Sequence, residues 1–226
     1  VWAWFRGRPG AGAEALHAIS PCLAALERIP RTTGDAKAPY WDNIFFSALD
    51  AMALYAMVAT RRPRRIIEIG SGNSTKFAAQ AIRDTALSTT LISIDPQPRA
   101  EIDELCTQVL RQRLEDIDLQ LFSDAGRGDF IFLDSSHRAF TNSDVTTFFL
   151  EILPRLASGV VVHIHDIFLP WDYPAEWSTR YYSEQYLMAC WLLAGPQRCR
   201  LLMSNAFTSY DPDLRRTLTG MLERSP

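Results

Sequence analysis

Long apolar runs are missing from this sequence, and so is any excess of basic residues. No stretch approaches the ~20 consecutive apolar residues that a membrane-spanning helix needs, so we expect a soluble protein without a membrane partner. Lys and Arg number 23 against 26 Asp and Glu, which gives a net charge of −3. The basic clusters are short, and nucleic acid is therefore not expected as a partner.

Cysteine pairs are absent as well. The four cysteines lie far apart with no Cys-x-x-Cys spacing, which is typical of reduced thiols in a cytoplasmic protein and argues against disulfides or a zinc knuckle. These cysteines are Cys22, Cys106, Cys190 and Cys199.

The apolar content is sufficient for one substantial core, because 47% of the 226 residues are hydrophobic. Residues 1–39 are rich in Gly, Ala, Pro and Arg, which predicts an N-terminal extension. Its helical patch, residues 13–29, contains Pro21, which is expected to start, kink or split the helix. Residues 40–226 are expected to form a single domain.

Short apolar runs alternate with helical patterns along that domain, which predicts crossover connections and a mainly parallel sheet with helices on both faces. The predicted strands are residues 65–70, 91–95, 117–122, 129–134, 159–165 and 199–205. The predicted helices are residues 40–60, a segment from about Ser74, and residues 100–115, 143–156 and 183–194.

Ligands of such sheets lie beyond the carboxyl ends of the strands. Four predicted strands end there in acids, namely Glu68, Asp95, Asp134 and Asp166. The first turn, "EIGSGNST", has Gly70 and Gly72 at the spacing of a tight strand-to-helix turn, because glycine tolerates positive φ and lets a ligand approach the backbone.

The residues around this turn discriminate between ligands. A dinucleotide fingerprint has a third glycine where Thr75 stands, and no Gly-Lys-Ser/Thr of a P-loop is present. Glu68 would repel a pyrophosphate but suits an ammonium and a sulfonium, and Asp95 is placed to accept both hydrogen bonds of a ribose diol. These features favour S-adenosylmethionine over NAD. Asp124, expected after the next strand, could receive an adenine amino group.

The motifs "RIIEIGSGNST", "LISIDPQPR", "DFIFLDSSH" and "GVVVHIHDIFLPWDYP" together resemble those of class I S-adenosylmethionine-dependent methyltransferases, in the methyltransferase domain 24 branch. The resemblance spans about residues 40–210 and implies a Rossmann-like α/β fold. By position it implies cofactor contacts from Glu68, Gly70, Ser71, Gly72, Asn73, Ser74, Asp95 and Asp124.

One part of the family pattern is in doubt. The family sheet usually closes with a seventh, antiparallel strand, which here is either "NAFTSY" or missing. A missing strand would weaken the sheet edge or require a partner to cover it, so a homo-oligomer is one possibility.

The stretch "VVVHIHDIF" places His163 and His165 on the same face of a strand, roughly 6.5–7 Å apart. We expect His163 to be structural. Some relatives bind Mg²⁺ after the fourth and fifth strands, where Asp134, His165 and Asp166 stand here, although a histidine suits a transition metal better. These three residues are the candidate ligands of a divalent metal ion.

Without a metal, the acceptor's proton requires a base, and a histidine with a near-neutral pKa is the usual one. The catalytic candidates are His137, His165 and Asp134. The aromatic segment 168–177, with Tyr40 and Trp41, could wall the acceptor pocket.

The sequence therefore predicts a methyltransferase acting on a small molecule, with a sugar or natural-product hydroxyl as the first choice by analogy. A metal-dependent hydrolase built on His163 and His165 is a weaker alternative, because only His17 and His137 remain as further histidine ligands. A third alternative is a non-catalytic protein with a methyltransferase-like fold.

Overall fold

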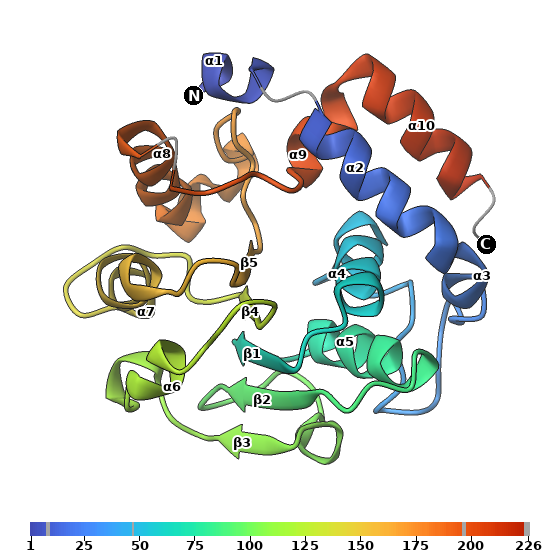
Figure 1. The fold of residues 1–226 in the computed structure, drawn as a ribbon, viewed down its shortest axis with the longest axis horizontal. Coiled ribbons are helices and arrows are strands. Elements are labelled where there is room, and N and C mark those ends of the chain that lie inside the picture. The colour runs from blue at the N-terminus through green and yellow to red at the C-terminus, as the bar shows by residue number, and fades with distance from the viewer. Residues whose placement is uncertain (8–9, 47, 196–197, 224–226) are drawn as a thin grey trace.

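The computed structural model describes residues 1–7, 10–46, 48–195 and 198–223. Its centre is a sheet of five parallel strands in the order β3-β2-β1-β4-β5 (Figure 1). The strands are β1 (Arg65–Ile69), β2 (Thr90–Ile94), β3 (Gln108–Leu110), β4 (Phe130–Leu133) and β5 (Val161–Ile164). This order reverses direction between β1 and β4, and the residues that follow these two strands, Gly70 and Asp134, lie side by side there.

Helices cover both faces of the sheet (Figure 1). The α-helices are α1 (Trp2–Arg6), α2 (Gly10–Ile19), α3 (Leu23–Leu26), α4 (Ala48–Arg61), α5 (Asn73–Asp84), α6 (Gln120–Ser123), α7 (Asp144–Thr147), α8 (Glu184–Ala194), α9 (Asn205–Tyr210) and α10 (Pro212–Leu222). Short 3-10 turns span Ser20–Cys22, Asp103–Leu105, Leu114–Asp116, Leu153–Arg155 and Ala175–Arg180, and Phe148–Ile152 extends α7 as a π-helix. The predicted class, a Rossmann-like sheet between helical layers, is confirmed.

Alternate residues of the central strands supply two separate cores. Ile66 and Phe132 face α4 and α5, whereas Ile67 and Leu133 face α7. Strands buried on both faces must be apolar along their whole length, which explains the continuous rather than alternating apolar runs of the sequence.

The N-terminal extension packs onto this domain. Leu16, Ile19 and Leu26 of α2 and α3 are fully buried in the same core as α4. Pro21 lies in the 3-10 turn between the two helices, so of the three predicted effects the split is the one observed. In Figure 1, α10 runs beside α2 and adds Leu214 and Leu218 to that core.

Three secondary-structure predictions are wrong, and the helix predicted over residues 40–60 begins later, at Ala48. Residues 100–115 do not form a helix, because Gln108–Leu110 pairs with β2 as strand β3. Residues 117–122 are not a strand and instead lead into α6. Residues 201–204 are irregular, and Asn205–Tyr210 is α9, capped by the Ser204 hydroxyl, which accepts from the Phe207 N–H.

The same segment was a candidate for the seventh, antiparallel strand of the family sheet. The segment "NAFTSY" is helical, and within the described residues β5 has β4 as its only strand neighbour. No described helix is long and apolar enough to cross a membrane.

Candidate active site

The turn between β1 and α5 is shaped by its neighbours. Gly70 has φ +76°, and a Cβ at this position would lie 1.8 Å from the Asp134 carbonyl oxygen, so only glycine fits. Gly72 has an extended φ of 173°, with nothing within 4 Å of where a Cβ would stand. The prediction of a positive φ is right for Gly70 and wrong for Gly72, whose open side leaves room for a ligand.

Hydrogen bonds to the Glu68 carboxylate stabilise this turn. Its side chain is buried, and its two oxygens accept hydrogen bonds from the Ser74 Oγ at 2.7 Å and the Thr75 Oγ1 at 2.5 Å. The Thr75 Oγ1 in turn accepts from the Gly72 N–H at 3.0 Å. Burial raises the pKa of Glu68 to about 7, although both hydroxyls oppose the shift. Glu68 and Ser74 therefore shape the turn, and the cofactor contacts predicted for them stay a prediction.

An open cleft of about 320 Å³ lies beyond the ends of β1, β2 and β4. Its lining includes Gly70, Ser71, Asp95 and Asp134. The Asp95 carboxylate accepts from the Ser71 N–H at 2.8 Å and the Gln97 N–H at 2.7 Å, and a carboxylate keeps lone pairs for further donors. This cleft is of the size and position expected for a small ligand at the reversal point of the strand order.

Two predicted cofactor residues lie elsewhere. The Asn73 Nδ2 donates to the Asn43 Oδ1 at 3.1 Å. Asp124 is exposed at the end of α6, where it accepts from the Gln120 Nε2 at 2.8 Å, and it is not among the residues of the cleft. Asp124 follows a helix and not the expected strand, and its adenine role stays a prediction. Glu115, after β3, is a further acid that lines the cleft, and it was missed in the sequence because β3 itself was missed.

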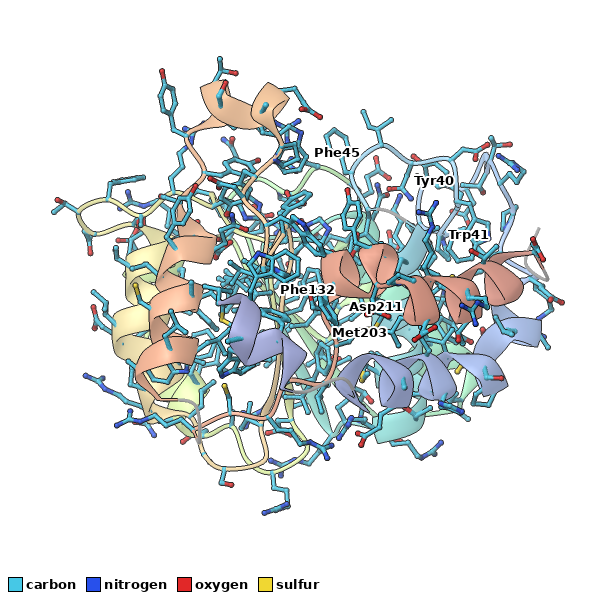
Figure 2. The ribbon with its side chains drawn as sticks, turned by 90° about the horizontal axis from the view of Figure 1, so that it is seen from above. Tyr40, Trp41, Phe45, Phe132, Met203 and Asp211 are labelled. Carbon is cyan, nitrogen blue, oxygen red and sulfur yellow. The ribbon has the colours of Figure 1, made fainter. Side chains whose placement is uncertain are left out.

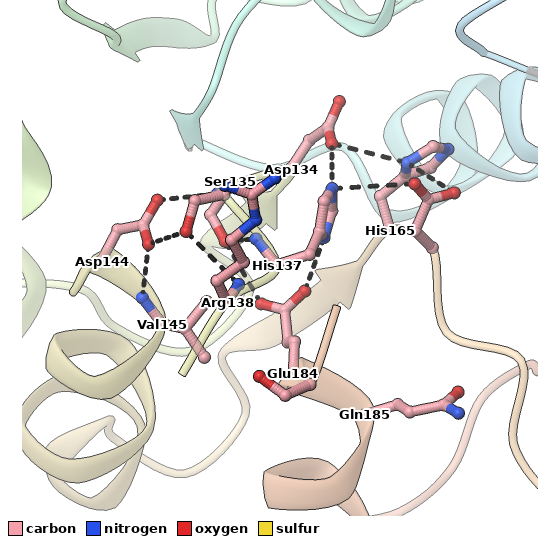
Figure 3. A network of polar contacts seen from close by, with 12 residues as sticks. Asp134, Ser135, His137, Arg138, Asp144, Val145, His165, Glu184 and Gln185 are labelled. Carbon is pink, nitrogen blue, oxygen red and sulfur yellow. Dashed lines mark hydrogen bonds and ion pairs between the residues drawn. The ribbon is translucent and has the colours of Figure 1, made fainter. Parts of the chain in front are cut away.

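A cluster of acids and histidines adjoins the cleft at Asp134 (Figure 3). The His137 Nε2 lies 3.1 Å from the Asp134 Oδ1 and 3.7 Å from the Asp166 Oδ2. The His165 Nδ1 lies 3.5 Å from the Asp166 Oδ1 and 3.6 Å from the Asp134 Oδ1, and its Nε2 lies 3.6 Å from the Asp50 Oδ2. The structure thus brings together four residues that the sequence singled out separately.

The backbone at this cluster is strained. His137 and Asp166 both have positive φ, +60° and +54°, which residues other than glycine adopt rarely and at a cost. Such conformations gather at functional sites, where the surrounding structure holds a side chain in a required direction. Here the two strained residues face each other, with the His137 Nε2 3.7 Å from the Asp166 Oδ2.

The charges in the cluster follow from this arrangement. Burial acts to lower the pKa of His137, but Asp134 and Glu184 outweigh it and raise the pKa to about 9. The pKa of His165 is likewise raised by Asp134 and Asp50 against the effect of burial. Burial acts to raise the pKa of Asp134, but the two histidines lower it. The raised pKa values favour the protonated form of both imidazoles at neutral pH, and the predicted role of either as a catalytic base stays a prediction.

His163 has a different environment. Its ring packs edge-on against Phe132, with the ring centres 4.7 Å apart, and burial lowers its pKa to about 4. A structural role for His163 fits these contacts, and the fourth histidine, His17, is exposed on α2.

The predicted metal ligands form no metal site in this structure. Among the described residues, no group of three His, Cys, Asp or Glu side chains is arranged to hold an ion. Instead, the His165 ring pairs with both Asp134 and Asp166. The chain therefore offers no support for the hydrolase alternative.

Aromatic rings from the segment after β5 adjoin the cluster. Tyr182 stacks on His137 with ring centres 4.5 Å apart, and Trp177 lies 5.6 Å from Tyr182 and 5.2 Å from Phe168. Trp41 does not join this wall, because it packs 5.3 Å from Phe77 of α5. Figure 2 shows Tyr40 next to Trp41, and Lys76 stands over the Tyr40 ring.

One known family matches the part of the chain that contains this arrangement. Residues 67–167 match the model of a family described as a methyltransferase domain. The matched family is a class I S-adenosylmethionine-dependent methyltransferase family. The methyltransferase match begins within β1 and ends just after β5, so it contains the glycine turn, the cleft and all of the acid–histidine cluster except Asp50. No curated protein matches the chain.

Proposed function

We propose that the chain is an S-adenosylmethionine-dependent methyltransferase acting on a small molecule, most simply on a hydroxyl of a sugar or natural product. The observation that carries the proposal is the continuity of the cleft: it runs from Gly70 and Asp95 to Asp134, where the acid–histidine cluster begins. The family match supports methyl transfer in general. The choice of a hydroxyl acceptor rests on the cluster.

The residues present fit such a ligand. Gly72 leaves open space beside the turn, and Asp95 offers a carboxylate to a ribose diol. Glu115 offers a second acceptor at the side of β3. S-adenosylmethionine supplies a methyl group on a positively charged sulfur. Attack of an acceptor oxygen on that methyl carbon mainly requires alignment of the two atoms and exclusion of water.

The cluster offers a route for the acceptor's proton. A hydroxyl oxygen must lose its hydrogen as it takes up the methyl group, and Asp166 is the group best suited to accept it. Burial raises the pKa of Asp166 despite the two histidines, which makes its carboxylate a stronger base than an exposed aspartate. The imidazolium rings of His137 and His165 would stabilise the partial negative charge that develops on the acceptor oxygen.

Calorimetric titration with S-adenosylmethionine and S-adenosylhomocysteine tests the proposal. Binding is expected for the unsubstituted chain and for Asp213→Ala, a matched control on the exposed side of α10, and is expected to be weakened in Asp95→Ala. Absence of binding to the unsubstituted chain would overturn the proposal. Release of S-adenosylhomocysteine with panels of glycosides, phenols and amines, with and without a chelator, would then identify the acceptor and any metal requirement.

A further inference from the structure

Two consecutive residues at the start of α8 contact both loops that carry the cluster. Glu184 and Gln185 are completely buried, although charged and amide side chains are rarely found so. They lie outside the segment that matches the methyltransferase family, and sequence reasoning assigned them no role. Figure 3 shows Glu184 beneath His137, with Gln185 next to it.

Glu184 is bonded to the loop after β4. Its Oε2 accepts from the His137 Nδ1 at 2.8 Å, and its Oε1 accepts from the Ser135 Oγ at 3.3 Å. The backbone reinforces this contact, because the N–H groups of Ser183 and Glu184 donate to the His137 carbonyl oxygen at 2.8 and 3.1 Å. The Ser183 Oγ also accepts from the Ala139 N–H at 2.8 Å. His137 is therefore fixed through both its ring and its main chain.

Gln185 is bonded to the loop after β5. Its Oε1 accepts from the Phe168 N–H at 3.0 Å, and its Nε2 donates to the Trp171 carbonyl at 3.5 Å and to the Asp172 Oδ1 at 3.3 Å. Its own N–H donates to the Tyr173 hydroxyl at 3.1 Å. Every polar group of this buried amide is thus used on residues 168–173.

We propose that Glu184 and Gln185 are positioning residues for the transfer site: Glu184 orients the His137 ring toward Asp134 and Asp166, and Gln185 holds residues 168–173 as a wall of the acceptor pocket. That these contacts serve methyl transfer rests on the proposed function. Packing alone does not account for the pair, because an apolar side chain would fill the same space without the cost of burying polar groups.

The hydrogen on the His137 Nδ1 provides a direct measurement for Glu184. We expect a downfield, slowly exchanging proton resonance in the NMR spectrum of the unsubstituted chain, because this hydrogen is buried and donated to a carboxylate. In Glu184→Gln the resonance should persist but move upfield, since an amide oxygen is a weaker acceptor. In Glu184→Ala it should exchange with water and vanish. Glu151→Gln, on an exposed stretch of the π-helix, is the matched control.

Hydrogen exchange of backbone amides provides the measurement for Gln185. In Gln185→Ala, exchange in residues 168–173 should rise by about tenfold, the change that corresponds to one or two lost hydrogen bonds. The His137 resonance should stay in place. If Glu184→Gln leaves the His137 resonance unmoved, or if Gln185→Ala accelerates exchange equally throughout the chain, the positioning roles are overturned.

These outcomes are independent of cofactor binding. Calorimetry on the same variants should give an unchanged affinity for S-adenosylmethionine, because the side-chain hydrogen bonds of Glu184 and Gln185 go to neither the glycine turn nor Asp95. With an acceptor from the panels above, Glu184→Gln should lower kcat and leave the KM for S-adenosylmethionine unchanged; an unchanged kcat would count against the role. If the unsubstituted chain binds no S-adenosylmethionine, the proposed function fails while the NMR result still decides what Glu184 does to His137.

Discussion

The Gly70 Cα and the Asp134 carbonyl oxygen approach so closely that a methyl group on residue 70 would lie 1.8 Å from that oxygen. This contact joins the glycine turn of β1 to the end of β4, where the acid–histidine cluster begins. Gly70→Ala combines this clash with the cost of a positive φ, so we expect a loss of about 2–4 kcal/mol of unfolding free energy. Urea unfolding measures the loss.

Gly72→Ala is the matched control for that substitution. Its φ is extended and its Cβ would meet nothing within 4 Å, so stability should be nearly unchanged. Affinity for S-adenosylmethionine should nevertheless fall, because the added methyl group would occupy space proposed for the ligand. Equal urea midpoints for the two variants would contradict this account of the turn.

The raised pKa of Glu68 predicts that the free energy of unfolding falls as pH rises. Its pKa of about 7 in the folded chain exceeds the usual value of 4.5, so the folded state keeps this proton to higher pH than the unfolded state. The contribution of Glu68 to stability is complete below pH 4.5 and is lost as pH rises through 7, by about 3 kcal/mol. Glu68→Gln should remove this component. Unfolding free energies measured from pH 5 to pH 8 should fall less steeply in the variant; parallel curves would show that Glu68 does not titrate in this range.

The sheet was predictable from the sequence for a physical reason. Strands buried on both faces need nearly continuous apolar runs, and β1, β2, β4 and β5 have them. A glycine, an acid or a histidine follows each of them. The shared position of Asp134 and Asp166 followed from parallel strands, whose carboxyl ends meet at one edge. The family resemblance rested on these same residues.

What the sequence could not predict depends on contacts between distant residues. Gln108–Leu110 has a weak pattern of its own and becomes a strand because β2 offers it hydrogen bonds. Glu184 follows His137 by 47 positions, and no local pattern connects them. The charge of His137 depends on that contact, so its high pKa could not be read from the sequence.

The raised pKa of His137 predicts a pH dependence of stability with the same sign as that of Glu68, in a higher pH range. Its pKa is raised from 6.5 to about 9, so its ion pairs stabilise the fold fully below pH 6.5 and lose that effect as pH rises through 9. His137→Gln should therefore be destabilised by about 3 kcal/mol at pH 6 and by much less at pH 10. Chemical denaturation at both pH values checks this, with His17→Gln as an exposed control. A difference that stays constant with pH would mean that packing, not charge, is responsible.

The sequence predicts Asp124 as the second acid, after Asp95, that contacts the cofactor, whereas the cleft in the structure favours Glu115. Only Glu115 lines the cleft with Asp95, and its side chain is 11% exposed, whereas Asp124 lies outside at the end of α6. On the proposed function, Glu115→Ala should weaken S-adenosylmethionine binding by about fivefold to tenfold, the value of one hydrogen bond. Asp124→Ala should leave the affinity unchanged in the same calorimetric titration. The opposite ranking would mean that the ligand extends past α6, and that the cleft beside β3 is not where its adenosine lies.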